Sequence, residues 1–203
     1  MKKTAFLFPG QASQAVGMGK DIYEEFGYVR EIFDMAEEVT RMKLSNLCFE
    51  GPMSDLTLTM NQQPAITVVN LAYLAVLEKE GRGPDVSAGH SLGEFSALCA
   101  AGVISKEDAM RLVCKRGELM HRESLKREGA MAAIVKLSME DVSACVAAAV
   151  SAGVVSVANH NSEQQIAISG SPEAVDKAAA LAVEKGGRAI RLKVSGAWHS
   201  ELI

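Results

Sequence analysis

The residues best suited to chemistry stand in one short stretch, Gly89-His90-Ser91-Leu92-Gly93, which has the pattern G-x-S-x-G. A short apolar run precedes the stretch and a good helix former follows it, so we expect strand, turn and helix in that order. Glycines on both sides allow a strained turn, and Ser91 then stands at a helix N-terminus, where N–H groups favour developing negative charge. Such a serine is either a nucleophile or an ordinary helix N-cap, and the pattern alone leaves both open.

A serine nucleophile needs a base that takes its proton. Among the four histidines, His199 is the preferred base, because it lies in a Gly/Ser-flanked loop just after the last predicted strand. His90 adjoins Ser91, and adjacent side chains diverge on such a turn, so we expect His90 to line the pocket. His121 falls on a predicted helix, and His160 lies in the stretch ANHNS, where one predicted strand gives way to the next.

The oxyanion needs hydrogen-bond donors, and an acidic substrate needs a cation. The N–H of Leu92 follows the nucleophile at the start of the helix. The Pro9-Gly10-Gln11 loop offers a second N–H at Gln11, although these residues also suit an ordinary turn. Arg116 has apolar helical neighbours. It is either solvated, or it points inward and grips a substrate carboxylate with two parallel bonds.

The elements that must position these residues alternate along the first part of the chain. The pattern predicts an α/β layer structure there. The segment 51–64 is loop-like, with one short helical or extended turn, and Pro64 suits the first turn of a helix that ends at Gly81. The other expected elements are a strand at 4–8, a helix at 20–40, a strand before Ser91, and helices at 92–104 and 105–125.

The pattern changes after residue 126. Strands at 130–137, 154–162, 164–171 and 188–196, with helices at 138–153 and 171–187, give the order βαββαβ of a ferredoxin-like subdomain. We therefore expect three parts: a core at 1–125, a ferredoxin-like subdomain at 126–196, and a return segment at 197–203 that carries His199.

Composition excludes several classes of function. The chain has 203 residues, 48% of them hydrophobic and 23% charged, with a net charge of −4, so no overall field attracts nucleic acid. The four cysteines form no CxxC pair and no metal-ligand spacing, which favours reduced cysteines in a cytoplasmic protein and no metal. The apolar run at the start stops at Pro9, too soon for a signal peptide, and no run is long enough to span a membrane.

Seven motifs in order along the chain resemble the acyltransferase family of fatty-acid and polyketide synthesis, which includes malonyl-CoA:acyl-carrier-protein transacylase. They are FLFPGQASQAVGMG, QQPAI, AGHSLGEFSALCAAGVIS, Arg116-Gly117 with Met120, GAMAAI, NHNS and SGAWHS. The resemblance implies an α/β-hydrolase-like core with an inserted ferredoxin-like subdomain. It also implies transfer of a malonyl group from coenzyme A, through a seryl ester, to the phosphopantetheine thiol of acyl carrier protein. It implies no cofactor, because the coenzyme A thioester is the substrate.

The resemblance also assigns roles to residues. It makes Ser91 the nucleophile, His199 the base, and the N–H groups of Gln11 and Leu92 the oxyanion hole, and it makes Arg116 the group that holds the malonyl carboxylate. The positions that match residues lining or bracing the family's pocket are Gln63, His90, Met120, Asn161, Gln165 and Trp198.

The sequence departs from the family in three places. Ala12 stands where the family often has glycine, a mild change if its φ is negative. Trp198 is bulkier than the usual residue, which favours malonyl over methylmalonyl. The chain stops four residues after His199, so the resemblance implies that it lacks the family's C-terminal third, which would supply the group that orients His199.

Two other functions compete with acyl transfer. A serine esterase or thioesterase would share the serine turn but would need no inward Arg116. A non-catalytic fragment would bind coenzyme A or a carrier protein without turnover. Both proposed partners, malonyl-CoA and acyl carrier protein, are anionic, so docking on this net-negative chain would need local basic residues.

Overall fold

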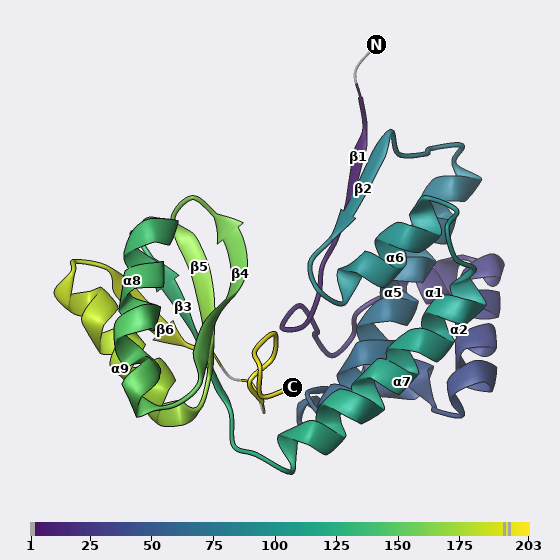
Figure 1. Ribbon diagram of the computed structural model, residues 1–203. Coiled ribbons are helices and arrows are strands. Elements are labelled where there is room, and N and C mark those ends of the chain that lie inside the picture. Colours follow the sequence, from purple (N-terminus) through teal and green to yellow (C-terminus); the bar gives the residue numbers. More distant parts are fainter. Residues whose placement is uncertain (1–2, 193, 195) are drawn as a thin grey trace. The chain divides into compact units, whose positions relative to one another are not determined.

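The computed structural model describes residues 3–192, 194 and 196–203. It is an α/β protein whose internal contacts divide into two compact units, residues 1–119 and 120–203. The division falls within α7 (Lys106–Ser124), shortly before the change of pattern at residue 126. Each unit is described by itself below, with the elements labelled as in Figure 1.

The first unit is built on two parallel strands, β1 (Ala5–Phe8) and β2 (Val86–Gly89), which pair so that Phe8 lies opposite Gly89. Strand alternation places Phe6 and Phe8 among core residues of this unit and leaves Leu7 76% exposed. Figure 1 shows β1 and β2 side by side, with helices gathered along them. The helices are α1 (Lys20–Glu25), α2 (Gly27–Thr40), α3 (Leu44–Glu50), α4 (Met53–Leu56), α5 (Thr59–Lys79), α6 (Gly93–Ala100) and α7.

Helix α5 is the centre of this unit. Its residues from Gln62 to Ala72 are all buried, so it is enclosed on all sides rather than along one stripe. Its Leu71 and Ile66 belong to the same core as Val29 and Phe33 of α2. The helix that carries this core therefore also carries Gln62 and Gln63, whose polar side chains are 4% and 0% exposed.

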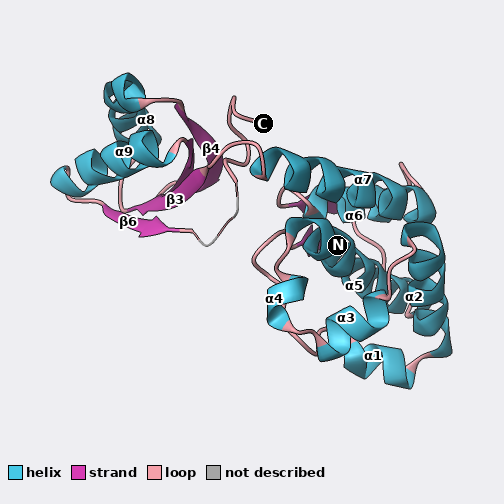
Figure 2. Cartoon of the chain, turned by 90° about the horizontal axis from the view of Figure 1, so that it is seen from below, coloured by secondary structure: helices cyan, strands magenta, loops and turns pink. Residues whose placement is uncertain are grey.

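The second unit is an antiparallel sheet with helices on one face. Its strands are β3 (Ala130–Val135), β4 (Val155–Ser162), β5 (Gln165–Gly170) and β6 (Arg188–Arg191), in the order β4-β5-β3-β6. Helices α8 (Met139–Ala149) and α9 (Pro172–Glu184) lie across that sheet (Figure 2), and a short 3-10 turn, η1 (Val150–Ala152), follows α8. Its core packs Ile134, Ile166 and Ile168 against Val142 and Val175 of the helices.

Several predicted boundaries were wrong. The helix expected at 20–40 is interrupted at Phe26, which is extended and both ends α1 and begins α2. The stretch 51–64 is mostly helical, and α5 begins at Thr59, so Pro64 lies inside a helix rather than at its start. Helix α3 was not predicted. The last strand ends at Arg191, and Lys193 and Ser195 of the predicted range lie outside the described residues.

Candidate active site

Ser91 lies on a sharp turn between β2 and α6. Its φ is +50°, a left-handed conformation that costs an L-residue energy. The flanking glycines make the turn feasible: a Cβ on Gly89 would lie 2.0 Å from the carbonyl carbon of Gly93, and a Cβ on Gly93 would lie 2.1 Å from the Phe8 oxygen. This is the strand–turn–helix setting that G-x-S-x-G needs in order to present a serine.

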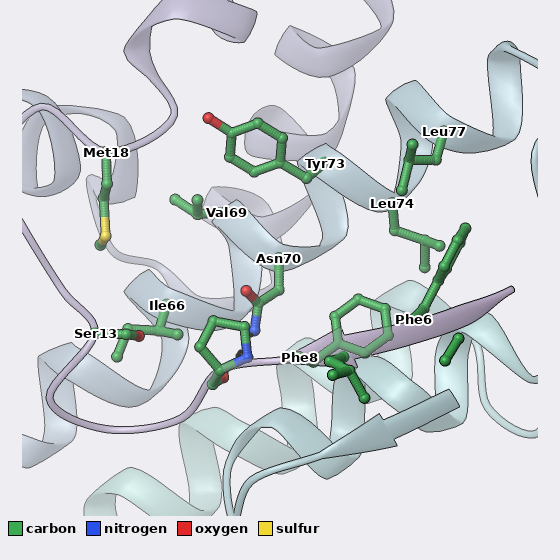
Figure 3. A pocket seen from close by; sticks show the side chains of 13 residues that line it. Phe6, Phe8, Ser13, Met18, Ile66, Val69, Asn70, Tyr73, Leu74 and Leu77 are labelled. Atoms are coloured by element: carbon green, nitrogen blue, oxygen red, sulfur yellow. Dashed lines mark hydrogen bonds between the residues drawn. The ribbon is translucent and has the colours of Figure 1, made fainter. Parts of the chain in front are cut away.

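The loop after β1 lies directly against this turn. A Cβ on Gly10 would lie only 2.2 Å from the backbone oxygen of His90, so Gly10 permits the close approach. The amide of Asn70 donates to the Pro9 oxygen at 3.2 Å, and Figure 3 shows Asn70 reaching from α5 toward this segment. The loop therefore holds Gln11 near Ser91 and Leu92, within the first unit.

Arg116 of α7 points inward and contacts Ser91. Its Nη2 donates to the Ser91 Oγ at 3.0 Å, and its Nη1 donates to the Oε1 of Gln63 at 2.6 Å. The guanidinium also lies 6.0 Å from the ring centroid of Phe95. Burial lowers the pKa of Arg116, and the nearby Glu94 carboxylate partly offsets that effect. Of the two alternatives for Arg116, the structure shows the inward one.

Three glutamine side chains continue from Arg116 into the protein. Gln63 Nε2 donates to Gln11 Oε1 at 3.1 Å, and Gln11 Nε2 donates to Gln62 Oε1 at 2.6 Å. The sequence analysis missed Gln62, because the QQP motif does not show that its two glutamines have different hydrogen-bond partners. It also missed Phe95, which is typical of an ordinary apolar helix position.

The remaining predicted residues belong to the second unit. Met120 and Trp198 are buried in one small apolar cluster with Met131 and Ala167. The Trp198 ring also lies over the backbone of Gly196, because a Cβ there would come within 2.7 Å of the ring. His199 follows with an exposed side chain and a φ of +60°.

Two predicted residues lie at the β4–β5 hairpin of the same unit. Asn161 is near the end of β4 and Gln165 begins β5, and both are exposed. The predicted site residues thus form two groups. Residues 1–119 hold Gln11, Gln63, His90, Ser91, Leu92 and Arg116, and residues 120–203 hold Met120, Asn161, Gln165, Trp198 and His199.

Ala12 does not fit its expectation. Its φ is +77°, in the left-handed region, so the backbone here favours glycine and the alanine is not a mild change. The strained residue directly follows Gln11.

A cavity of about 400 Å³ lies in the first unit, apart from Ser91. It is lined by β1 and by α5 residues that include Val69, Tyr73 and Leu77 (Figure 3), and neither Ser91 nor Arg116 lines it. In the part of the chain that the structure describes, no group of three or more His, Cys, Asp or Glu side chains is placed to hold a metal ion. No helix among the same residues is both long enough and apolar enough to cross a membrane.

Comparison with known proteins adds a family match. Residues 5–203 match the model of the acyl transferase domain. The malonyl CoA-acyl carrier protein transacylase of Bacillus subtilis (strain 168) is 48% identical over 100% of this chain, but the match covers 65% of that relative. The chain thus spans less than two thirds of that relative's length.

Solved structures of similar proteins agree with this family match. The malonyl CoA-acyl carrier protein transacylase of Clostridium perfringens has a TM-score of 0.93 and 40% identity, over 99% of this chain and 64% of that one. A complex of a type II PKS acyl-carrier protein with its malonyl-transacylase has a TM-score of 0.94 and 37% identity, over 99% of this chain and 66% of that one.

Proposed function

Because the chain belongs to the acyl transferase domain family, we propose that it transfers a malonyl group from coenzyme A to the phosphopantetheine thiol of an acyl carrier protein, in fatty-acid or polyketide synthesis. The names of the similar proteins support this substrate and this partner. The observation that carries the proposal is the Arg116 guanidinium 3.0 Å from the Ser91 Oγ.

A cation at this distance from a nucleophile fits an acyl group that carries a carboxylate. The malonyl carboxylate would exchange the Ser91 contact of Arg116 for two parallel hydrogen bonds. Burying that carboxylate without a partner would cost several kcal/mol, so Arg116 would select for an acidic acyl group. A neutral acyl group would leave the half-buried guanidinium without its anion, which argues against a general esterase.

The proposed reaction is an exchange of two thioesters through one ester. The Ser91 Oγ attacks the thioester carbonyl while a base, which we assign to His199, takes its proton. The N–H groups of Leu92 and Gln11 stabilise the oxyanion. Collapse breaks the C–S bond, and the coenzyme A sulfur leaves with the proton from the base. The carrier thiol then attacks the seryl ester, gives its proton to the base, and Ser91 recovers it. The steps balance without a cofactor or a metal.

The fold supports a finer proposal. The parallel strands β1 and β2, with Ser91 directly after β2, fit an α/β-hydrolase-like core. The order β4-β5-β3-β6 in a βαββαβ segment fits a ferredoxin-like subdomain inserted into that core. We also propose a cytoplasmic location, where coenzyme A thioesters and carrier proteins would meet the enzyme.

The test is to mix the folded chain with malonyl-CoA, quench the mixture, and measure the mass of the intact protein. We expect a malonyl adduct on Ser91 that is absent in Ser91→Ala. We expect Arg116→Ala to slow its formation at least roughly a hundredfold. Arg111→Ala is the matched control, because Arg111 lies on the same helix and pairs with Glu107 and Asp108 on the surface.

The same samples separate the competing functions. Addition of a carrier protein should move the malonyl group to its thiol, whereas an esterase would release free malonate at the same rate with or without the carrier. If folded protein binds coenzyme A but forms no adduct with malonyl-CoA or acetyl-CoA, these 203 residues do not carry the proposed activity.

A further inference from the structure

Four polar side chains form one continuous hydrogen-bonded row in the first unit. Arg116 donates to Gln63 at 2.6 Å, Gln63 donates to Gln11 at 3.1 Å, and Gln11 donates to Gln62 at 2.6 Å. We call these four side chains the amide row. It begins at the cation beside Ser91 and ends at the Oε1 of Gln62, a residue of the QQPAI motif to which the family resemblance assigns no role.

The chemistry of the row gives it one direction. A guanidinium only donates, so Gln63 must turn its oxygen toward Arg116 and therefore its NH2 toward Gln11. Gln11 must then present its oxygen to Gln63 and its own NH2 to Gln62. The Oε1 of Gln62 is the last acceptor in this series of hydrogen bonds. Without it, the NH2 of Gln11 would lose its acceptor, and only the Gln63 NH2 would hold the Gln11 amide in this orientation.

Because two members of the amide row are buried, a change in the direction of its hydrogen bonds would leave polar groups without partners. Gln63 is fully buried and Gln62 is 4% exposed, so water cannot readily replace a lost partner. The backbone of Gln62 is fixed on α5, where its N–H bonds to the Leu58 oxygen at 2.8 Å. Its side chain thus ties the loop residue Gln11 to the central helix.

We infer that Gln62 is a positioning residue for Arg116: its oxygen accepts from the Gln11 NH2, completes the amide row and thereby holds the guanidinium where it meets the carboxylate of an acidic acyl group. The inference rests on the proposed function for its substrate, and it makes Gln62 a determinant of acyl selectivity. Gln62 acts through Gln11 and Gln63, whereas Arg116 makes the contact with Ser91.

The test compares two substitutions at position 62 of the whole chain. Gln62→Met keeps a similar shape and removes the acceptor, whereas Gln62→Glu keeps acceptor oxygens. Ser91 acylation is measured with malonyl-CoA and with acetyl-CoA. For Gln62→Met we expect the preference for malonyl over acetyl to fall roughly tenfold. The main cause should be a higher concentration of malonyl-CoA needed for half-saturation, and acetyl transfer should change less. We expect Gln62→Glu to retain the preference.

Two controls exclude a merely structural effect. Asn61→Ala changes the neighbouring amide on α5, which bonds only the Asp55 oxygen among the described contacts, and it should leave the preference unchanged. In an Arg116→Ala background, Gln62→Met should cause no further loss of selectivity. If Gln62→Met does not fold, Gln62→Ala removes the acceptor without placing a new group. Equal losses for both acyl groups, or no loss, would overturn the inference.

A second measurement separates this inference from the proposed function. NMR of the Arg116 side chain reports rotation of its guanidinium without any substrate. We expect slow rotation in the parent chain and faster rotation in Gln62→Met. If the parent forms no adduct but Gln62→Met still frees the guanidinium, the proposed function fails and the positioning role stands. If rotation is the same in both proteins, the positioning role fails.

Discussion

At the scale of single residues, Ser91 combines a reactive position with an unfavourable backbone. Its φ of +50° costs an L-residue roughly 1–2 kcal/mol relative to glycine. We therefore expect Ser91→Gly to unfold with a free energy roughly 1 kcal/mol higher than Ser91→Ala, a comparison in which both variants lose the hydroxyl. Urea unfolding of the two variants measures the difference. An alanine variant as stable as the glycine variant would show that the turn is not strained.

Cys48 illustrates the opposite case, a nucleophilic group that the fold keeps inactive. Burial raises the pKa of its thiol to about 12, with a smaller contribution from Glu37, and its Sγ lies 3.7 Å from the Ala65 oxygen. We expect iodoacetamide at pH 8 to leave Cys48 unmodified in the folded protein and to modify it after unfolding. The half-buried Cys114 is the internal control and should react first. Mass spectrometry of the peptides would contradict this if both react alike in native buffer.

At the scale of elements, the sequence predicted best where the pattern was local. The Ser91 turn followed from its glycines, because only glycine fits within about 2 Å of the neighbouring backbone atoms. The predicted start of α5 at Pro64 was wrong, because proline indicates only a local preference, whereas the turn before Pro64 packs against another helix. A Cβ on Gly117 of α7 would lie 3.2 Å from the Met60 backbone and from the Thr59 oxygen, so the two helices are in close contact there. Proline cannot donate a backbone hydrogen bond at this position, so tertiary packing as well as local sequence decides where α5 begins.

The row behind Arg116 could not be predicted for a related reason. A glutamine on a helix usually faces water, and the burial of Gln62 and Gln63 arises from α5 being enclosed on every side. The partner Gln11 is 52 residues from Gln63, a distance in sequence that no periodic pattern reports. The orientation of Arg116 could not be decided from the sequence either, because its apolar helical neighbours fit a solvated arginine as well as an inward one.

Helix α8 offers a prediction about an element's start. The Ser138 hydroxyl accepts from the Asp141 N–H and donates to the Asp141 carboxylate at 2.9 Å. We expect Ser138→Ala to lower the free energy of unfolding by about 1 kcal/mol at pH 7. Ser143→Ala, an exposed serine within the same helix, should have little effect. Chemical unfolding of the two variants at neutral pH measures this.

The same cap should weaken in acid. Hydrogen bonds from Lys185 and then Ser138 lower the pKa of Asp141 below its ordinary value of 3.8. A carboxyl whose pKa is lower in the folded state stabilises the fold above its unfolded pKa, and that contribution is lost as pH falls through the folded pKa. The difference between Ser138→Ala and the parent should therefore narrow below pH 3.8. A difference that stays constant into acid would show that the carboxylate takes no part.

At the scale of the whole molecule, the two units have separate cores. The larger core runs from Phe8 to Val113, the core beneath the second sheet runs from Ala130 to Ala182, and they share no residue. Ile134 is fully buried in the second core. Shortening it to alanine removes buried methyl groups and leaves a cavity, which costs roughly 2–5 kcal/mol.

We expect that loss to remain within one unit. In Ile134→Ala, amide hydrogen exchange should accelerate across residues 120–203 and change little in 1–119, because local opening follows contiguous cooperative units. Leu71→Ala, in the core around α5, is the reciprocal control and should accelerate exchange in 1–119 instead. If either substitution accelerates both halves equally, the chain unfolds as one cooperative body. In that case a substitution in the second core would also disturb the residues around Ser91, and the amide row would depend on both cores.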